Sequence, residues 1–265
     1  MAHAQRCAFT AVASLLALSP LASPVLAGDT SPTLRPPRAA ASTVTCPVPA
    51  PPPPNPNALW NLVECCKQGK DTHCVIKNPD DAYIVAKDAS KSKPEAYLII
   101  PSIKMTGIED PQTLETPTLN IWQYGWTESL KTHKFDESNL GLAINSRKSR
   151  DQDQLHIHMS CVKSGVFKAL EGVKVSSDPT SPTKLQLPPN NNTYAAVLLE
   201  RSLVGNSSPF KILRQLPHVN AQNISEQSVA IVKGRDPQTF VFLNTYAHDQ
   251  DQGEAEELLN QTCSR

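Results

Sequence analysis

The chain has no excess of charge of either sign. Its 265 residues carry 25 basic and 25 acidic side chains, so the formal net charge is zero with histidine neutral. A protein that binds nucleic acid usually carries a basic excess. The composition therefore argues against a nucleic-acid partner. It also provides no strong electrostatic attraction to an anionic membrane surface.

Long apolar stretches are scarce, and the one near the N-terminus is short. Arg6 precedes the apolar run CAFTAVASLLAL, and VLA at 25–27 has the small residues of a cleavage site. Pro20 and Pro24 interrupt the run well short of the ~20 residues that a membrane-spanning helix needs. We expect a secretory signal peptide over 1–27 and export as a secreted or periplasmic protein. An uncleaved membrane anchor is the alternative.

Residues 28–57 contain few side chains that could build a core. The segment is rich in Pro, Ala, Ser and Thr and ends in PVPAPPPPNPN. Such a composition favours extended polyproline conformation, so we expect a disordered, semi-stiff spacer. The folded domain is expected over 58–265, where we find no repeat of fixed period.

No CxxC pair is present, although the chain has seven cysteines. Zinc sites commonly use such pairs, so their absence weakens a structural zinc site. Cys7 leaves with the expected signal peptide, and an even number of cysteines in an exported chain suggests disulfides. The sequence does not choose among the pairings. The remaining six are Cys46, Cys65, Cys66, Cys74, Cys161 and Cys263.

Four tripeptides of the N-x-S/T type could carry glycans in a host that glycosylates exported proteins. They begin at Asn191, Asn206, Asn223 and Asn260.

Apolar periodicity over the folded region predicts an α+β fold with mostly antiparallel strands. The predicted strands are 82–87, 96–100, 140–146, 154–161, 194–202, 228–234 and 239–244. The predicted helices are 118–132, 162–172, 209–216 and 253–261. The broad apolar side of helix 118–132 is expected to pack on the sheet, because helical apolar stripes are usually core.

The segment QLHIHMSC, residues 154–161, alternates polar and apolar residues, as a half-buried strand does. One face is expected to be open and to carry Gln154, His156, His158 and Ser160. The other is expected to pack on the core and carries Leu155, Ile157, Met159 and Cys161. The two histidines would lie about 7 Å apart at their Cα atoms.

A polar connection, 147–153, joins this strand to the preceding one in a predicted β-hairpin. The end of the preceding strand and the start of this connection combine an amide, hydroxyls and cations that suit phosphate oxygens. A solvated charged turn is the alternative interpretation. The amide, hydroxyl and cationic side chains belong to Asn145, Ser146, Arg147, Lys148, Ser149 and Arg150.

Several kinds of chemistry use an H-x-H pair. A neutral imidazole can attack phosphorus while its neighbour hydrogen-bonds to a leaving oxygen. The pair could also ligate zinc with a third ligand from His73, His133, His218, His248 or a carboxylate. His158-Met159-Ser160 matches half of a phosphoesterase that uses two H-x-S/T motifs, and the chain has no second one. Two buried structural histidines are the fourth interpretation.

LAINSR at 142–147, followed by QLHIHMSC, resembles the CDP-diacylglycerol diphosphatase family of the histidine-triad superfamily. AYIVAKD, AYLIIPSIKMTGIEDP and ETPTLNIW extend the resemblance, which covers roughly 60–265. It implies a HIT-like antiparallel sheet with flanking helices, extended by a C-terminal α/β segment. Four cysteines fall where this family tends to keep them, and Cys46 with Cys65 could form an extra bridge to the spacer.

The resemblance implies hydrolysis of CDP-diacylglycerol to CMP and phosphatidate through a CMP-histidine intermediate. His156 would attack the α-phosphorus, His158 would assist the departing oxygen, and Asn145 would orient the substrate or a histidine. Arg147, Lys148 and Arg150 would supply charge, so no metal or other cofactor is expected. Gln154 replaces the first histidine of the triad and cannot titrate, but it can still hydrogen-bond, so we expect it among the residues that bind the substrate phosphates.

Two other functions stay open. The chain could pass CMP to an acceptor other than water, or it could be a secreted nucleotide- or lipid-binding protein without turnover. The lipid substrate would be met at a membrane surface, and the protein would be a monomer or, as in many histidine-triad proteins, a dimer.

Overall fold

A computed structural model describes residues 45–46, 55–78, 80, 82–132, 135–200, 202–248 and 251–263. They belong to the unit Thr43–Arg265. The expected signal peptide and most of the expected spacer lie outside the described residues. Within the described ranges, no helix combines the length and the apolar character that crossing a membrane requires.

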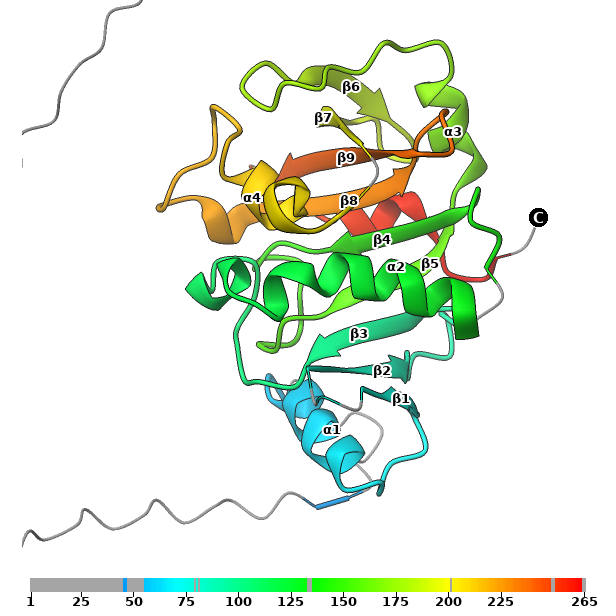
Figure 1. Cartoon of the computed structure of the whole chain (residues 1–265), viewed down its shortest axis with the longest axis vertical. Coiled ribbons are helices and arrows are strands. Elements are labelled where there is room, and N and C mark those ends of the chain that lie inside the picture. The colour runs from blue at the N-terminus through cyan, green and yellow to red at the C-terminus, as the bar shows by residue number, and fades with distance from the viewer. Residues whose placement is uncertain are drawn as a thin grey trace, which may run out of the picture. The chain divides into compact units, whose positions relative to one another are not determined.

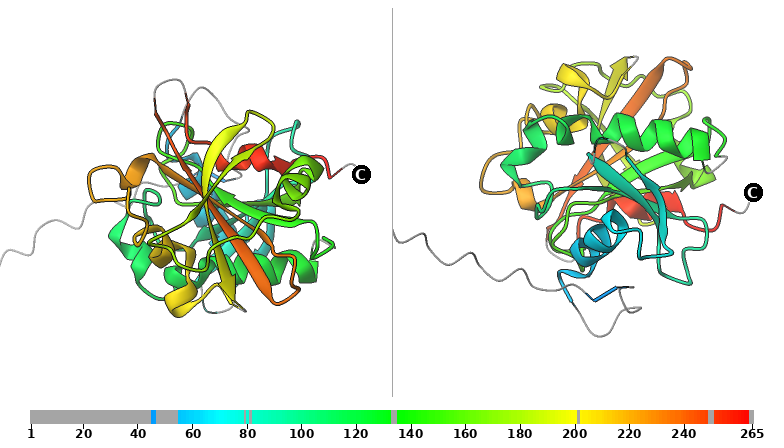
Figure 2. Two further views of the ribbon diagram at one scale, coloured as in Figure 1. Left: turned by 90° about the horizontal axis from the view of Figure 1, so that it is seen from above. Right: turned by 60° about the horizontal axis from the view of Figure 1, so that its bottom comes forward.

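The described residues form ten strands in one sheet, and each pairing is antiparallel (Figure 1). The order across the sheet is β1-β2-β3-β5-β4-β8-β9-β7-β6, and β10 pairs with β5. This confirms the predicted α+β class. The C-terminal extension continues the same sheet. The sheet is twisted, so that neighbouring strands are rotated relative to one another in the view from above (Figure 2). The strands are β1 (Cys74–Lys77), β2 (Tyr83–Lys87), β3 (Tyr97–Pro101), β4 (Leu140–Ile144), β5 (Ile157–Val162), β6 (Thr183–Leu187), β7 (Asn192–Glu200), β8 (Gln227–Lys233), β9 (Thr239–Tyr246) and β10 (Leu259–Asn260).

Three of the four predicted helices are present. The described helices are α1 (Ala58–Lys67), α2 (Ile121–Thr132), α3 (Ser164–Leu170) and α4 (Pro209–Leu213). The 3₁₀ turns are η1 (Pro111–Leu114), η2 (Thr118–Asn120), η3 (Gly205–Ser207), η4 (Ile224–Glu226) and η5 (Ala255–Leu258). The sequence patterns missed α1, β1 and β6.

The helix predicted over 253–261 is wrong. That segment forms η5 and then β10, which pairs with the end of β5 through Leu259 opposite Val162. The acidic residues expected on a solvated helix face, Glu256 and Glu257, are both buried. Their carboxylates are held by remote side chains, Asn145 and Tyr194 among them. Tertiary contacts therefore override the local helical pattern.

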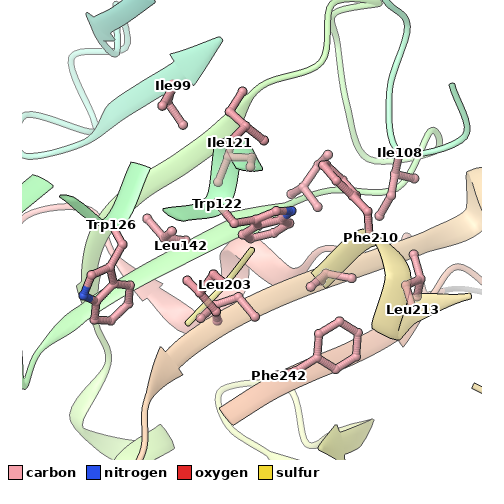
Figure 3. Packing of buried hydrophobic residues seen from close by; sticks show 14 of the residues in the cluster. Ile99, Ile108, Ile121, Trp122, Trp126, Leu142, Leu203, Phe210, Leu213 and Phe242 are labelled. Carbon is pink, nitrogen blue, oxygen red and sulfur yellow. The ribbon is translucent and has the colours of Figure 1, made fainter. Parts of the chain in front are cut away.

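Helix α2 packs on one face of the sheet, as its apolar side predicts. Trp122 is fully buried and meets the ring of Phe210 edge-on, with 5.7 Å between ring centroids (Figure 3). Gly125 brings the helix close to β3, since a Cβ there would lie 3.1 Å from Ile99 Cγ2. This core rigidly supports the strands that carry the histidines.

The opposite face of the sheet holds two smaller apolar clusters. One includes Leu98 and residues of α1, and the other includes Ala143 and residues of η5 and α3. His158 pairs with Leu98 on β3 and with Ala143 on β4. The histidine therefore lies between the two clusters. In Figure 1, α2 lies in front of the sheet and the C-terminal segment, in red, lies behind it.

Three disulfides confirm the prediction from the cysteine count. They join Cys46 to Cys65, Cys66 to Cys74 and Cys161 to Cys263. The first is the extra bridge that we expected between the spacer and the domain. The third closes a sequence separation of 102 residues and fastens the C-terminal segment to β5, the strand of His158.

Candidate functional site

The β4–β5 hairpin places the two histidines side by side. Strand β5 begins at Ile157, so His156 immediately precedes the strand and His158 lies within it, opposite Ala143. Their ring centroids are 4.9 Å apart and the rings meet edge-on. Two imidazoles at this separation can act on one phosphate group.

The prediction of an open polar face is wrong. Gln154 and Ser160 are fully buried, and His156 and His158 are only 9% and 5% exposed. The C-terminal segment covers this face, where Ser160 Oγ donates to the carbonyl of Asn260 at 3.0 Å. The polar alternation is real, but the polar face binds other protein groups instead of water.

His156 has a defined tautomer. Its Nδ1 lies 2.8 Å from the backbone oxygen of Gln154, which can only accept a hydrogen bond. Nδ1 therefore carries the proton and Nε2 keeps its lone pair. Burial lowers the pKa of His156, although the Gln154 carbonyl and the Glu256 carboxylate act in the opposite direction. The ring is thus a neutral nucleophile with Nε2 available.

The side chain of Gln154 fixes a neighbouring loop. Its Nε2 donates to the carbonyls of Pro101 and Ile103 at 3.2 and 2.9 Å, and its Oε1 accepts from the backbone N of Met105 at 3.3 Å. Only an amide can donate twice and accept once in this way. The side chain of Gln154, at the first triad position, therefore holds the backbone of the loop after β3. The backbone oxygen of Gln154 orients His156.

Asn145 holds a residue that sequence reasoning missed. Its Nδ2 donates to Glu256 Oε2 at 3.0 Å, and the backbone N of Glu256 donates to Asn145 Oδ1 at 3.0 Å. This reciprocal pair brings the C-terminal segment to the histidines. The prediction that Asn145 orients the substrate or a histidine stays a prediction; the residue that Asn145 binds directly is Glu256.

Glu256 is the centre of a buried charge cluster. Its Oε1 accepts from Lys93 Nζ at 2.5 Å and from Gln261 Nε2 at 2.7 Å, and it lies 3.1 Å from His158 Nδ1. Burial would lower the pKa of Lys93, but the Glu256 carboxylate outweighs burial and raises it. Lys93 is therefore a firmly charged cation beside the histidines.

His158 is buried without a hydrogen bond. Neither of its ring nitrogens has a hydrogen-bonding partner within the described part of the chain, since Nδ1 lies near Glu256 without good alignment. Burial, together with His156 and Lys93, lowers the pKa of His158 well below its usual value. An unpaired buried polar group is costly. Its retention here is typical of a site that completes its contacts with a ligand.

Asp88, His158 and Glu256 are the described side chains that could hold a metal ion. Their donor atoms lie within 4.8 Å of one another. The ammonium of Lys93 is already bonded to Oε1 of Glu256. The set contains one histidine and two carboxylates, whereas a zinc site usually has at least two histidine or cysteine ligands. We therefore assign no metal here, and the metal-free site stays a prediction.

The basic loop after β4 divides into bound and exposed side chains. Ser146 Oγ donates to the carbonyl of Gln252, and the Arg150 guanidinium forms a two-pronged pair with Glu109 at 2.9 and 2.6 Å. Arg147 and Lys148 are exposed. Among the predicted phosphate ligands of this loop, Arg147 and Lys148 therefore have exposed charges, whereas Ser146 and Arg150 are bonded to other protein groups.

A family comparison covers all of these residues. The sequence profile described as CDP-diacylglycerol pyrophosphatase matches residues 54–265. The chain belongs to this family. The family membership suggested by LAINSR and QLHIHMSC is thereby confirmed, and the histidines, Asn145, Lys93 and Glu256 all lie within the matched region.

Two relatives carry the CDP-diacylglycerol pyrophosphatase name. A probable CDP-diacylglycerol pyrophosphatase of Mycobacterium leprae is 33% identical over 180 residues, which is 64% of this chain and 65% of that protein. A CDP-diacylglycerol pyrophosphatase of Yersinia pestis is 38% identical over 102 residues, 37% of this chain and 39% of that protein. The matches thus span less than two thirds of either relative.

Two solved structures have a distant likeness to this family member. A DUF4931 family protein of Bacillus cereus has a TM-score of 0.42 at 11% identity, covering 67% of this chain and 87% of that chain. The yeast Ap4A phosphorylase in complex with AMP has a TM-score of 0.40 at 16% identity, covering 71% and 64%. These likenesses carry no functional conclusion.

Arg150 is expected to stabilise the fold in this CDP-diacylglycerol pyrophosphatase family member. Its side chain is 4% exposed, and Arg150→Met would leave the Glu109 carboxylate without its partner. We expect the free energy of unfolding to fall by about 3 kcal/mol. Denaturant titration checks this, with the exposed Arg147→Met as matched control. Equal stability of the two variants would contradict the structural role of Arg150.

Proposed function

We propose that this protein hydrolyses the pyrophosphate of CDP-diacylglycerol to CMP and phosphatidate. The observation that carries the proposal is the fixed tautomer of His156, whose Nδ1 faces the Gln154 carbonyl and whose Nε2 is free to attack phosphorus. Membership of the CDP-diacylglycerol pyrophosphatase family supports the substrate class. The second histidine at 4.9 Å supports proton transfer at the same group.

The reaction proceeds in two displacements. Nε2 of His156 bonds to the phosphorus of the CMP half, and the bond from that phosphorus to the phosphatidate oxygen breaks. Water then attacks the same phosphorus and releases CMP from the histidine. Cations stabilise negative charge on the phosphate oxygens. Lys93 lies beside the histidines, and Arg147 and Lys148 have exposed charges on the loop after β4. We assign these three cations to this role, so the steps need no metal or other cofactor.

The lipid substrate places the reaction at a membrane surface. The acyl chains stay in the bilayer while the head group reaches the histidines. Export through the N-terminal signal peptide would bring the protein to the outer surface of a membrane, where the predicted glycans and the three disulfides also belong. A monomer and a dimer are both compatible with this function.

Product analysis tests the proposal. The purified protein is incubated with CDP-diacylglycerol in detergent and EDTA, with and without added alcohols. We expect release of CMP and phosphatidate in EDTA. CMP esters of the alcohols would instead favour a nucleotidyl transferase, and tight CMP binding without turnover would favour a binding protein. Complete loss of activity in EDTA that zinc reverses would overturn the metal-free mechanism.

The pH profile provides a second test. Attack requires neutral His156, and burial lowers the pKa of that ring below the usual 6.5. As pH rises through this lowered pKa, the ring loses its proton and kcat/KM rises. We therefore expect the acid limb of kcat/KM to lie below pH 6.5. An acid limb centred above pH 6.5 would contradict a buried, neutral nucleophile.

A further inference from the structure

The C-terminal segment delivers one carboxylate to the catalytic histidines. We infer that Glu256 is a positioning residue: the charge of its carboxylate, 3.1 Å from Nδ1 of His158, favours the tautomer that carries the proton on Nδ1 and leaves Nε2 of that ring free to take a proton from the attacking water. This inference rests on the proposed hydrolysis and adds to it a residue from the distant end of the chain.

Each histidine has an acceptor near its Nδ1. His156 Nδ1 is hydrogen-bonded to the Gln154 carbonyl at 2.8 Å, whereas His158 Nδ1 lies 3.1 Å from Glu256 Oε1 without the alignment of a hydrogen bond. Glu256 and His158 are both 5% exposed, so water screens the carboxylate charge only weakly. That charge favours a proton on Nδ1 of His158, so Nε2 of each ring keeps its lone pair. The pair thus provides one nucleophile and one base.

Several donors hold Glu256 in place. Asn145 binds Oε2, while Lys93 and Gln261 bind Oε1. The Cys161–Cys263 disulfide fastens the same segment to β5. An ion pair with Lys93 alone would not require Glu256 Oε1 to lie near His158 as well. His158 has no hydrogen-bonding partner in the described part of the chain. The carboxylate is therefore placed to stabilise charge on His158.

The tautomer assigns His158 to the second displacement. A phosphatidate anion leaves without taking a proton, whereas an attacking water must lose one. In that step the water oxygen bonds to phosphorus and the P–N bond to His156 breaks, returning its electron pair to the ring. The water proton passes to Nε2 of His158, and the Glu256 carboxylate stabilises the imidazolium. The proton is then lost to solvent.

The titratable groups that face His158 come from four segments of the chain. They are Asp88 after β2, Lys93 before β3, His156 before β5 and Glu256 on η5. Lys93 and His156 disfavour a positive charge on His158, so the Glu256 carboxylate offsets them at the moment of proton transfer. Loss of the carboxylate should therefore slow hydrolysis of the intermediate more than its formation.

Accumulation of the intermediate tests this inference. The full chain is mixed with CDP-diacylglycerol labelled in the CMP half, quenched at successive times and assayed for protein-bound label and free CMP. In Glu256→Gln we expect CMP release to slow by about 100-fold and the labelled protein to accumulate. Glu254→Gln makes the same change at an exposed residue of the same segment and should behave like the wild type.

The outcomes separate the inference from the proposed function. Equal slowing of both steps in Glu256→Gln, without accumulation of label, would overturn the role of Glu256. If that variant does not fold, the imidazole ¹⁵N spectrum of the wild type decides: protonated Nδ1 on His158 supports the inference and protonated Nε2 overturns it. A wild-type protein that yields neither CMP nor labelled protein would overturn the proposed hydrolysis itself.

Discussion

Replacement of His156 by glutamine is expected to lower turnover of CDP-diacylglycerol by about 10⁴-fold or more, the range seen when an active-site nucleophile is removed. Glutamine has a similar size, so the fold should remain. It cannot attack phosphorus, however, and no other described imidazole has its Nδ1 bound to a backbone carbonyl beside β5 in this way. Steady-state release of CMP is the measurement.

The control for this variant is His248→Gln. His248 is exposed on the segment after β9, so the same substitution there should leave turnover within about twofold of the wild type. Circular dichroism and a denaturant titration of His156→Gln would show that it remains folded. A folded His156→Gln protein with full activity would eliminate the nucleophilic mechanism.

Removal of the Cys161–Cys263 disulfide is expected to cause the largest loss of stability. In the chain-entropy account, a cross-link over 102 residues stabilises the folded state by about 4.7 kcal/mol. The variant Cys161→Ala with Cys263→Ala should lose a comparable free energy of unfolding. It should also lose turnover, because β10 and the preceding Glu256 would be released from β5.

The Cys66–Cys74 bridge is the matched control. It spans only 8 residues, for which the same account gives about 2.5 kcal/mol, and it ties α1 to β1 away from the histidines. Its double alanine variant should therefore be less destabilised and should keep the turnover of the folded protein. If the two double variants lost equal stability and equal activity, the special role of the Cys161–Cys263 bridge would be excluded.

Local patterns predicted the parts of the site that are close in sequence. Alternation in QLHIHMSC and in LGLAINS predicts β5, β4 and their antiparallel pairing, because two strand patterns joined by a short polar connection are typical of a hairpin. The apolar side of α2 likewise predicts its packing on the sheet. These features depend on side chains within one element or one hairpin.

Contacts across long separations could not be predicted in this way. Glu256 lies 111 residues from Asn145 and 163 residues from Lys93. Its own neighbourhood, GEAEELLNQ, has a helical pattern that gives no sign of burial. The open face predicted for His156 and His158 was wrong for the same reason, since the covering segment comes from the far end of the chain. Only pairing between remote strands places it there.

In the proposed reaction, CMP is transferred to His156 before it reaches water. To test this transfer, excess protein is mixed with CDP-diacylglycerol labelled in the CMP half and quenched in base within a single turnover, and the label is mapped by mass spectrometry. We expect a nucleotidyl group on the peptide that contains His156, formed before free CMP and lost as CMP is released. Free CMP that forms without any protein-bound label, or label on a different residue, would contradict it.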